Sequence, residues 1–213
     1  MAGKPCLLSS RPGIVIFRCM NDMISYFGYG SLVNDRTRAE GSIAVPGRLT
    51  GWRREWRIAG KTPYGGVCSL SVRCDAASEV AGLMVHEHAR GLPALDEREW
   101  RYERRDLPDG AFRPDDPAAG TVTGFVYTAR AEHSRWGDAD HPILQSYVDC
   151  VLAGFFSYWG EAGVREFVET TDGWHVPIRN DREAPFYPRA VSLSDGERAL
   201  FDATLREVGA CWL

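Results

Sequence analysis

Lysine is nearly absent from the 213-residue chain, occurring only at positions 4 and 61, and no run of basic residues stands alone. The 25 basic residues are outnumbered by 29 acidic residues, which gives a net charge of −4. A protein that binds nucleic acid through its phosphates usually presents a concentrated basic face. The composition therefore predicts that nucleic acid is not a partner of this protein.

Long apolar segments and paired cysteines are lacking as well. No purely apolar run exceeds seven residues, whereas a helix that spans a bilayer needs about 18 or more apolar residues. The six cysteines form no C-x-x-C pair, and no secretory signal precedes them. We therefore expect no membrane partner, reduced thiols and a cytoplasmic protein.

The first 22 residues fit none of the patterns of the remaining chain. Pro5, Arg11 and Pro12 interrupt any apolar core of a signal peptide. Met20 and Met23 stand just before the first strong strand pattern, so translation starting at one of them is one interpretation. A loosely held N-terminal arm over residues 1–22 is another, and an edge strand over residues 14–17 is a third.

The remaining chain is expected to form a single domain over residues 23–213. Hydrophobic residues make up 44% and charged residues 25%, as in an ordinary globular protein. No internal repeat and no Ser/Gly-rich linker divides the chain, and its length is sufficient for a substantial core.

Short apolar or alternating segments dominate the first part of the domain and predict about six strands. Few helix-length segments separate them, so the pattern favours an α+β fold built on a small mixed barrel or sheet, not a regular βαβ array. Residues 106–120 are rich in Pro, Asp and Gly and predict a surface loop. The expected strands cover residues 23–28, 45–49, 52–58, 67–73, 79–86 and 122–127.

The last third is expected to be helical, with its helices packed around the sheet. Apolar residues from Ile143 to Trp159 share one face of a helix that begins near Pro142. Ser194 and Glu197 have the spacing of a capping box and predict the start of a second helix.

The first strand ends in a glycine-containing turn, Gly28-Tyr29-Gly30-Ser31-Leu32. Glycine permits close approach of a ligand to the backbone, and successive amides in a turn can bind an anion or a developing oxyanion. Val33 stands where a dinucleotide loop or a nucleophile elbow requires glycine, and the phosphate-loop Gly-Lys pair is absent. A binding turn and a plain tight turn both remain open on these residues alone.

A charged run over residues 96–106 contains one carboxylate that departs from a solvated face. On a helix through this segment, Glu99 falls on the same stripe as Leu92 and Leu95. A carboxylate on an inward stripe must be paired or have a raised pKa. Glu99 is therefore either half of a buried ion pair with a nearby arginine or a working acid/base.

Two further groups of residues carry weaker signals. His86 and His88 lie on one face of a strand, but no third metal ligand accompanies them, so we expect no metal site. Arg179, Arg182 and Arg189 lie in a segment that is either a solvated loop or a cover for the pocket, and Arg179 and Arg182 are candidate contacts for a substrate carboxylate.

The two motifs together resemble the gamma-glutamylcyclotransferase-like family. The 26–32 segment, YFGYGSL, and the later 95–99 segment, LDERE, are most similar to the ChaC-type branch, and the 46–56 segment, PGRLTGWRREW, resembles the family's Gly-aromatic-Arg-Arg strand. Members of the family convert a gamma-glutamyl group to 5-oxoproline and release an amine or amino acid. The resemblance implies a small mixed barrel surrounded by helices.

By this resemblance, Tyr29, Gly30, Ser31 and Leu32 form the substrate-binding loop, and Glu99 is the catalytic general acid/base. The implied partner is a small gamma-glutamyl substrate, and neither a metal nor an organic cofactor is implied. A non-catalytic barrel that binds a small molecule or a partner in the same pocket is an alternative. A cyclotransferase that acts on gamma-glutamyl amines instead of peptides is another.

Overall fold

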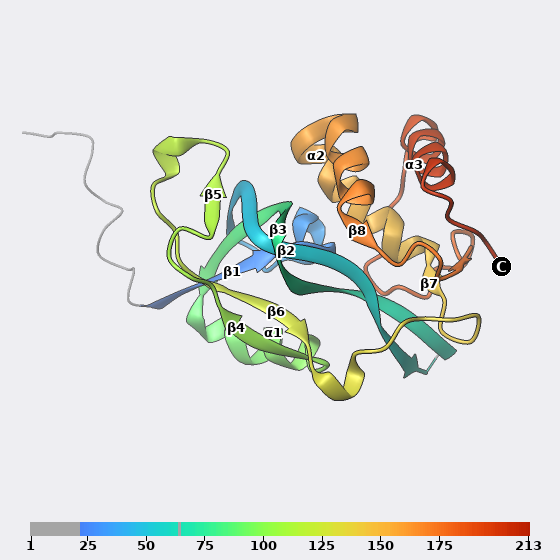
Figure 1. Ribbon diagram of the computed structural model, residues 1–213, viewed down its shortest axis with the longest axis horizontal. Coiled ribbons are helices and arrows are strands. Elements are labelled where there is room, and N and C mark those ends of the chain that lie inside the picture. Colours follow the sequence, from blue (N-terminus) through green and yellow to red (C-terminus); the bar gives the residue numbers. More distant parts are fainter. Residues whose placement is uncertain (1–21, 64) are drawn as a thin grey trace, which may run out of the picture.

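A long antiparallel hairpin forms the centre of the fold in the computed structural model, which describes residues 22–63 and 65–213. Its two strands, β2 (Ile43–Thr62) and β3 (Gly65–His88), pair from Ile43 opposite His86 to Thr62 opposite Gly65 (Figure 1). Four expected strands are therefore two long ones. Gly51, which lies between two of the expected strands, stands at an irregularity in the pairing with φ of 86°, a conformation that glycine adopts without strain.

The described strands form one mixed sheet with the order β4-β6-β1-β3-β2-β5. Only β1 and β6 pair in parallel along this path, and β4 and β5 end it, so the described sheet is open and the barrel alternative is not formed. The expected 106–120 loop contains β5, which pairs with β2. The other strands are β1 (Met23–Gly28), β4 (Tyr102–Asp106), β5 (Phe112–Pro114), β6 (Phe125–Ala129), β7 (Ile143–Leu144), β8 (Thr171–Asp172) and β9 (Ile178–Arg179).

Three α-helices accompany the sheet in the described chain: α1 (Leu92–Arg98), α2 (Gln145–Glu169) and α3 (Asp195–Glu207). In Figure 1, α2 and α3 lie together on one side of the hairpin, and α1 lies near β4 and β6. The capping box expected at Ser194 is confirmed. Short 3₁₀ helices cover Ser31–Val33, Asp35–Thr37, Ala89–Gly91, Pro117–Ala119 and Ala131–His133.

Two expected boundaries differ from the structure. The helix expected near Pro142 begins at Gln145, because residues 143–144 pair as β7 with β3 and β9. The helix expected to run through Glu99 ends at Arg98, and the chain enters β4 at Tyr102. The edge strand expected over residues 14–17 lies outside the described residues. Across residues 22–63 and 65–213, no helix combines the length and the apolar character needed to cross a membrane.

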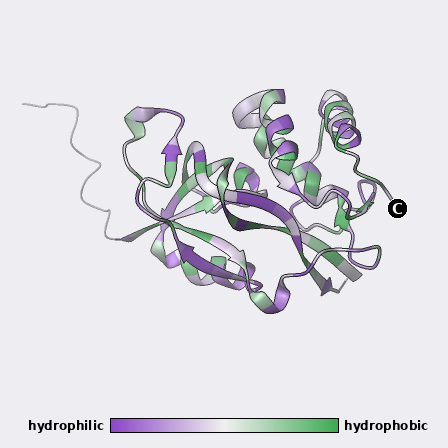
Figure 2. Ribbon diagram, viewed as in Figure 1, coloured by the Kyte–Doolittle hydropathy of each residue, from purple (hydrophilic) through white to green (hydrophobic). Residues whose placement is uncertain are grey.

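Arg54 is a fully buried cation in the middle of β2, a stretch that Figure 2 colours hydrophilic. Its Nε donates to the carbonyl oxygen of Tyr29 at 3.0 Å, and its terminal nitrogens donate to Thr170 Oγ1 at 2.6 Å and to the carbonyl oxygen of Ala81. These acceptors belong to the end of β1, to the end of α2 and to β3. One guanidinium therefore connects three parts of the chain.

Aromatic rings enclose the same guanidinium. The rings of Phe155 and Phe167, both on α2, each lie 4.9 Å from Arg54 Cζ, a distance at which a cation is attracted to the ring face. Burial lowers the pKa of Arg54 to about 9. That value is still above neutral pH, so the buried group carries a charge.

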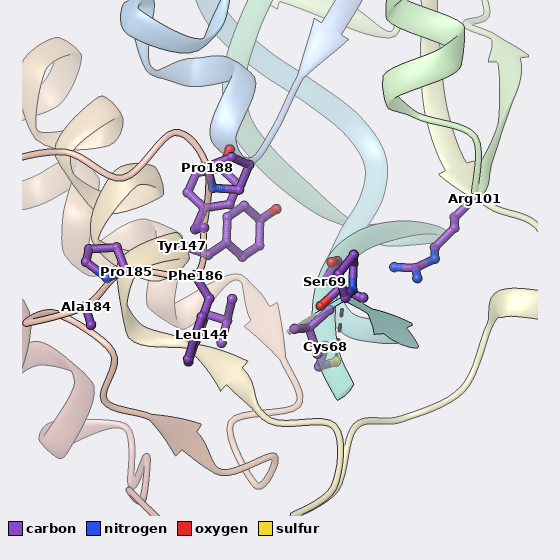
Figure 3. A pocket seen from close by; sticks show the side chains of 13 residues that line it. Cys68, Ser69, Arg101, Leu144, Tyr147, Ala184, Pro185, Phe186 and Pro188 are labelled. Atoms are coloured by element: carbon purple, nitrogen blue, oxygen red, sulfur yellow. Dashed lines mark hydrogen bonds between the residues drawn. The ribbon is translucent and has the colours of Figure 1, made fainter. Parts of the chain in front are cut away.

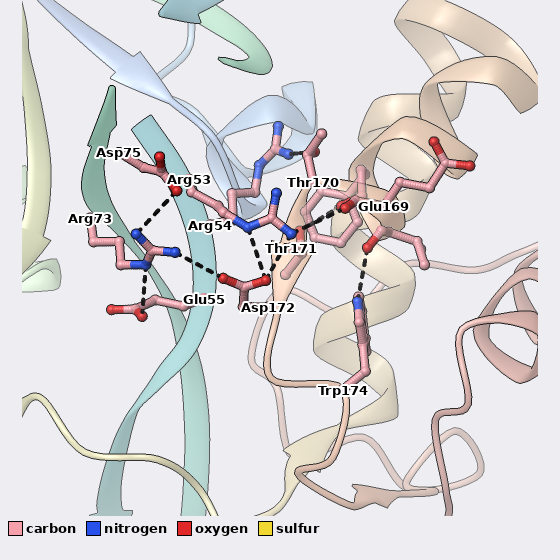
Figure 4. A network of polar contacts seen from close by, with 12 residues as sticks. Arg53, Arg54, Glu55, Arg73, Asp75, Glu169, Thr170, Thr171, Asp172 and Trp174 are labelled. Atoms are coloured by element: carbon pink, nitrogen blue, oxygen red, sulfur yellow. Dashed lines mark hydrogen bonds and ion pairs between the residues drawn. The ribbon is translucent and has the colours of Figure 1, made fainter. Parts of the chain in front are cut away.

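The neighbouring Arg53 belongs to a separate network at the surface of the hairpin (Figure 4). Arg53 Nε lies 2.9 Å from Asp172 Oδ1, and Arg73 on β3 lies 3.2 Å from the other oxygen of the same carboxylate. Arg73 also contacts Asp75 and Glu55. This network joins β2, β3 and β8 at the edge of the core, where solvent screens the charges.

We expect Arg54→Ala to lower the free energy of unfolding by about 3–5 kcal/mol, because it leaves a cavity and three oxygen acceptors without a donor. Arg53→Ala is the matched control and should cost about 0–1 kcal/mol, since its ion pair is half-exposed. Urea denaturation followed by circular dichroism measures both values. Equal losses in the two variants would show that the buried contacts of Arg54 do not stabilise the fold.

Candidate active site

The turn that follows β1 carries no side chain at two of its positions, Gly28 and Gly30. A Cβ on Gly28 would meet the Cβ of Leu32 at 3.0 Å, so a side chain there would crowd the turn. A Cβ on Gly30 would lie 3.3 Å from Leu70 Cδ2 and 3.4 Å from the hydroxyl of Tyr147. Leu70 and Tyr147 line a cavity beside the turn. Glycine at position 30 therefore leaves room for a ligand close to the main chain.

The four amide groups from Ser31 to Asn34 differ in their hydrogen bonding. The amides of Val33 and Asn34 donate to the carbonyl oxygens of Gly30 and Ser31 at 2.9 and 3.0 Å. The amides of Ser31 and Leu32 meet no acceptor within the described residues, as expected at the start of a 3₁₀ helix.

The turn is held in place by residues from distant parts of the chain. Tyr29 accepts the hydrogen bond from the buried Arg54 through its carbonyl oxygen, and its hydroxyl donates to the carbonyl oxygen of Tyr127 at 2.8 Å. Thr37 Oγ1 donates to the carbonyl oxygen of Ser31 at 2.6 Å. These contacts fix the backbone before any ligand arrives, which is the condition for efficient binding of a developing charge.

Glu99 is the first residue after α1, and its side chain is 14% exposed. Its amide donates to the carbonyl oxygen of Leu95 at 2.9 Å, and its own carbonyl oxygen accepts from the amide of Tyr102 at 2.8 Å. Burial raises the pKa of Glu99, while the positive charges of Arg98 and Arg189 partly oppose that increase. A carboxylate with a raised pKa is suited to proton transfer near neutral pH.

Arg98 joins Glu99 to the turn. Its Nε lies 3.0 Å from Glu99 Oε1, and one terminal nitrogen donates to Ser31 Oγ at 3.1 Å across 67 sequence positions. The other terminal nitrogen donates to the carbonyl oxygen of Thr37 at 2.7 Å. The carboxylate of Glu99 therefore has the arginine partner that one interpretation expects, and it also lies beside the turn.

Glu99 and Ser31 each line two adjoining cavities. The smaller one, here the turn cavity, is also lined by Tyr29, Gly30 and Leu32. The other, here the polar cavity, has a volume of about 160 Å³ and is lined by Arg98 and Arg189 among others. The turn cavity is completed by aromatic and apolar side chains, namely Phe27, Leu70, Tyr102, Tyr127 and Tyr147.

Of three tyrosines that line the turn cavity, Tyr29 is buried, and Tyr102 and Tyr147 are partly buried. Burial raises the pKa of Tyr29, Tyr102 and Tyr147 well above the ordinary value, and the negative charge of Glu99 adds to the effect. They stay neutral at physiological pH. Glu99 is therefore the one carboxylate among the residues that line the turn cavity, and its neighbours there do not compete for its proton.

The structure brings Glu99 together with Tyr29, Gly30, Ser31 and Leu32, but it places Arg179 and Arg182 elsewhere. Arg182 lies 2.6 Å from Asp149 and 2.8 Å from Asp202, so two carboxylates already occupy its guanidinium. Arg179 lies over the ring of Phe186 at 4.5 Å. Neither arginine lines the turn cavity or the polar cavity.

Arg98 and Arg189 are the site residues that the sequence interpretation did not select. Arg98 stands inside a charged run, residues 96–106, in which four of the eleven residues are arginines, so nothing in the local pattern distinguishes it. Arg189 belongs to the same arginine-containing segment as Arg182, but it reaches the polar cavity. Proximity to the turn is a tertiary property, and the composition of the segment indicated only the type of residue.

The paired histidines have ordinary local partners. His86 Nδ1 lies 2.8 Å from Ser25 Oγ, and His88 Nδ1 accepts from the amide of Arg90 at 3.1 Å. In the part of the chain that the structure describes, no group of three or more His, Cys, Asp or Glu side chains is arranged to hold a metal ion.

Comparison with known proteins shows the fold through solved structures. No family model matches the chain, and no curated protein matches it in sequence. A structure titled "Gamma-glutamyl cyclotransferase" superposes with a TM-score of 0.56 at 12% identity, covering 85% of this chain and 99% of its own. The uncharacterized protein loc79017 from Homo sapiens gives the same TM-score and coverage at 14% identity. YkqA from Bacillus subtilis gives 0.53 at 14% identity, covering 69% of this chain and 53% of its own.

This chain therefore has the gamma-glutamyl cyclotransferase-like fold, as its two motifs predicted.

We expect Arg98→Met to raise the pKa of Glu99 further, because the substitution removes the nearest positive charge from a buried carboxylate. Arg98→Lys retains the positive charge and should raise the pKa of Glu99 less. Arg90→Met removes an exposed cation that precedes α1 and should leave the pKa of Glu99 unchanged. Carbon-13 NMR titration of the Glu99 carboxyl group measures all three. An unchanged pKa in Arg98→Met would show that the ion pair does not influence Glu99.

Proposed function

We propose that this protein is a gamma-glutamyl cyclotransferase that converts a gamma-glutamyl group to 5-oxoproline and releases an amine or amino acid. One observation carries the proposal. The buried carboxylate of Glu99 has a raised pKa and lines a cavity together with a turn that has two free amides. Arg98 contacts the carboxylate of Glu99 and the side chain of Ser31 in the turn. The shared fold and the two sequence motifs support it.

In this reaction the α-amine of the substrate attacks its own γ-carbonyl carbon. A carbon–nitrogen bond forms to close the five-membered ring, and the bond to the leaving nitrogen breaks. Glu99 accepts a proton from the α-ammonium group, so that the free amine can attack, and later donates it to the leaving nitrogen. As the intermediate collapses, the ring nitrogen loses its second proton to the Glu99 carboxylate, which passes it to the released amine. The atoms balance without a metal or an organic cofactor. Because both reacting groups belong to one molecule, holding the glutamyl chain folded supplies much of the rate advantage.

The amides of Ser31 and Leu32 are the donors that we assign to the oxyanion of the tetrahedral intermediate. They lack acceptors within the described chain, and Arg54 and Thr37 hold their turn rigidly. Amides fixed in advance bind a developing negative charge without reorganisation. The reaction needs no covalent nucleophile, which agrees with the absence of an elbow motif around Ser31.

Arg189 is the arginine that we place opposite the α-carboxylate of the glutamyl group. It lines the polar cavity with Glu99, and it forms no ion pair with any described carboxylate. Arginine recognises a carboxylate through two parallel hydrogen bonds. The arginine-containing segment therefore contributes to the site through Arg189, whereas Arg182 holds Asp149 and Asp202.

A non-catalytic binding protein with the same cavity is the alternative function. It would bind a gamma-glutamyl ligand but would release no product. Incubating the purified protein with a panel of gamma-glutamyl peptides and amines, and detecting 5-oxoproline by mass spectrometry, separates the two. Binding of a panel member without release of 5-oxoproline would favour the binding protein.

Glu99→Gln should reduce turnover by about 10²–10⁴-fold, because the amide has nearly the same shape but cannot transfer the proton. Glu97→Gln, a change at an exposed position of α1, should keep full activity. Calorimetry should show that the Glu99→Gln variant still binds a gamma-glutamyl ligand. Near-normal turnover by this variant would assign the proton transfer to another group.

The pH profile gives an independent test of Glu99. A general base acts when it is deprotonated, so kcat/KM should rise with pH as Glu99 loses its proton. Because burial raises the pKa of Glu99, the midpoint of this rise should lie above the pKa of an ordinary glutamate. The measurement is kcat/KM between pH 4 and 8 in a constant-ionic-strength buffer, in parallel with circular dichroism to confirm folding. A flat profile over that range would contradict the assignment.

A further inference from the structure

A larger cavity opens beside the polar cavity and has no role in the chemistry described above. This apolar chamber has a volume of about 700 Å³, within the range of roughly 300–1,000 Å³ that is typical of small-molecule sites. Among the described residues that line it, Arg101 is the only charged one. Most of its wall is apolar and includes Val67, Cys68, Leu144, Pro185 and Phe186 (Figure 3).

The chamber and the polar cavity share part of their walls. Ser69, Arg101, Tyr147 and Tyr187 line both of them, and the rings of the two tyrosines lie 5.0 Å apart. A molecule that places its reacting end at Glu99 can therefore extend past these shared residues into the chamber.

Arg101 is held at this junction without a carboxylate partner. One of its terminal nitrogens donates to the carbonyl oxygen of Lys61 at 2.6 Å, and its guanidinium lies 4.7 Å from the ring of Trp100. It also packs against Gly60, where a Cβ would lie only 2.7 Å from Arg101 Cζ. Within the described chain it forms no ion pair. In Figure 3 it extends toward the cavity from the side opposite Leu144.

The geometry points to the apolar chamber as the subsite for the leaving group, which we infer to be an amino acid with a large apolar side chain. This inference rests on the proposed function, because Glu99 fixes the position of the scissile bond. The carboxylate of a leaving amino acid is attached one carbon from the leaving nitrogen, so it would lie near the junction and pair with Arg101. Its side chain would then enter the chamber and be removed from water.

A recess on another side of Glu99 suits a different leaving group. It has a volume of about 350 Å³ and is lined by Asp96, Glu99 and Glu103, together with Arg104 and Arg130. Three carboxylates would repel a leaving carboxylate and attract a cationic amine. No acidic side chain is among the described residues that line the apolar chamber, so these residues offer no ion pair to a leaving group with a free ammonium group on its chain.

Four substrates separate these possibilities. Gamma-glutamyl-phenylalanine has both the carboxylate and the apolar side chain, gamma-glutamyl-phenethylamide lacks the carboxylate, and gamma-glutamyl-glycine lacks the side chain. The gamma-glutamyl conjugate of 1,4-diaminobutane has a cationic leaving group. We expect kcat/KM for gamma-glutamyl-phenylalanine to exceed each of the other three by at least about tenfold.

Variants of the chamber provide the second readout. Arg101→Met should lower kcat/KM for gamma-glutamyl-phenylalanine about 10–100-fold more than for gamma-glutamyl-phenethylamide, because only the former loses a charged partner. Arg101→Lys should restore part of the difference. Arg105→Met is the control, since its guanidinium contacts Cys74 and Trp52 instead of the chamber. Ala184→Phe, at an exposed position that lines the chamber, should penalise gamma-glutamyl-phenylalanine relative to gamma-glutamyl-glycine.

Calorimetry on the Glu99→Gln background distinguishes failure of this inference from failure of the proposed function. Turnover with equal effects of Arg101→Met on both phenyl substrates, or a preference for the diaminobutane conjugate, would overturn the leaving-group assignment and leave the activity intact. Binding of gamma-glutamyl-phenylalanine that depends on Arg101, with no 5-oxoproline from any substrate, would overturn the activity and support the subsite as a binding site. Absence of both turnover and Arg101-dependent binding would overturn both.

Discussion

The buried guanidinium of Arg54 is the contact on which the site depends. Its hydrogen bonds go to Tyr29, Ala81 and Thr170, so the turn, the central sheet and the end of α2 meet at one cation. Burying a charge is costly unless its hydrogen bonds are satisfied, and here the acceptors are backbone and hydroxyl oxygens enclosed by two phenylalanine rings from α2. The same contact that completes the core therefore fixes the backbone carbonyl at the start of the binding turn.

Glu99 and Arg98 form a second charged contact, but its burial is incomplete and it faces a cavity. The two side chains remain 14% and 16% exposed. Arg98 limits the pKa increase that burial imposes on Glu99, so the carboxylate can be both deprotonated and sheltered. Arg54 has no such access to solvent. Arg54 therefore stabilises the fold, whereas Arg98 adjusts the protonation of a partly exposed carboxylate.

The segment after β9 illustrates how tertiary structure assigns different roles to chemically identical residues. Arg182 is held by carboxylates from α2 and α3 and ties the segment to the helices. That anchorage positions the residues that follow it, and Tyr187 and Arg189 reach the polar cavity. Residues 184–188 form one wall of the apolar chamber. The same segment thus contributes structural support, a cation for the polar cavity and the boundary of the larger cavity.

The sequence by itself determined the local features of this protein. The strand-turn pattern at residues 23–32, the capping box at Ser194 and the inward position of Glu99 depend on spacing and residue type within a few turns of chain, and the structure contains all three. The two motifs also indicated the fold that the solved structures show.

Contacts between residues far apart in the sequence follow from the tertiary structure. Four expected strands are two long ones because bulges at positions 50–52 and 56–58 let the strand pairing continue. The hydrophobic pattern is interrupted at such a bulge, so the pattern alone does not show that the pairing continues. Arg98, Arg189 and Arg101 reach the cavities, whereas Arg182 does not, although all four are arginines in polar segments. Long side chains find their partners across the fold, and those contacts depend on how helices and loops pack against the sheet.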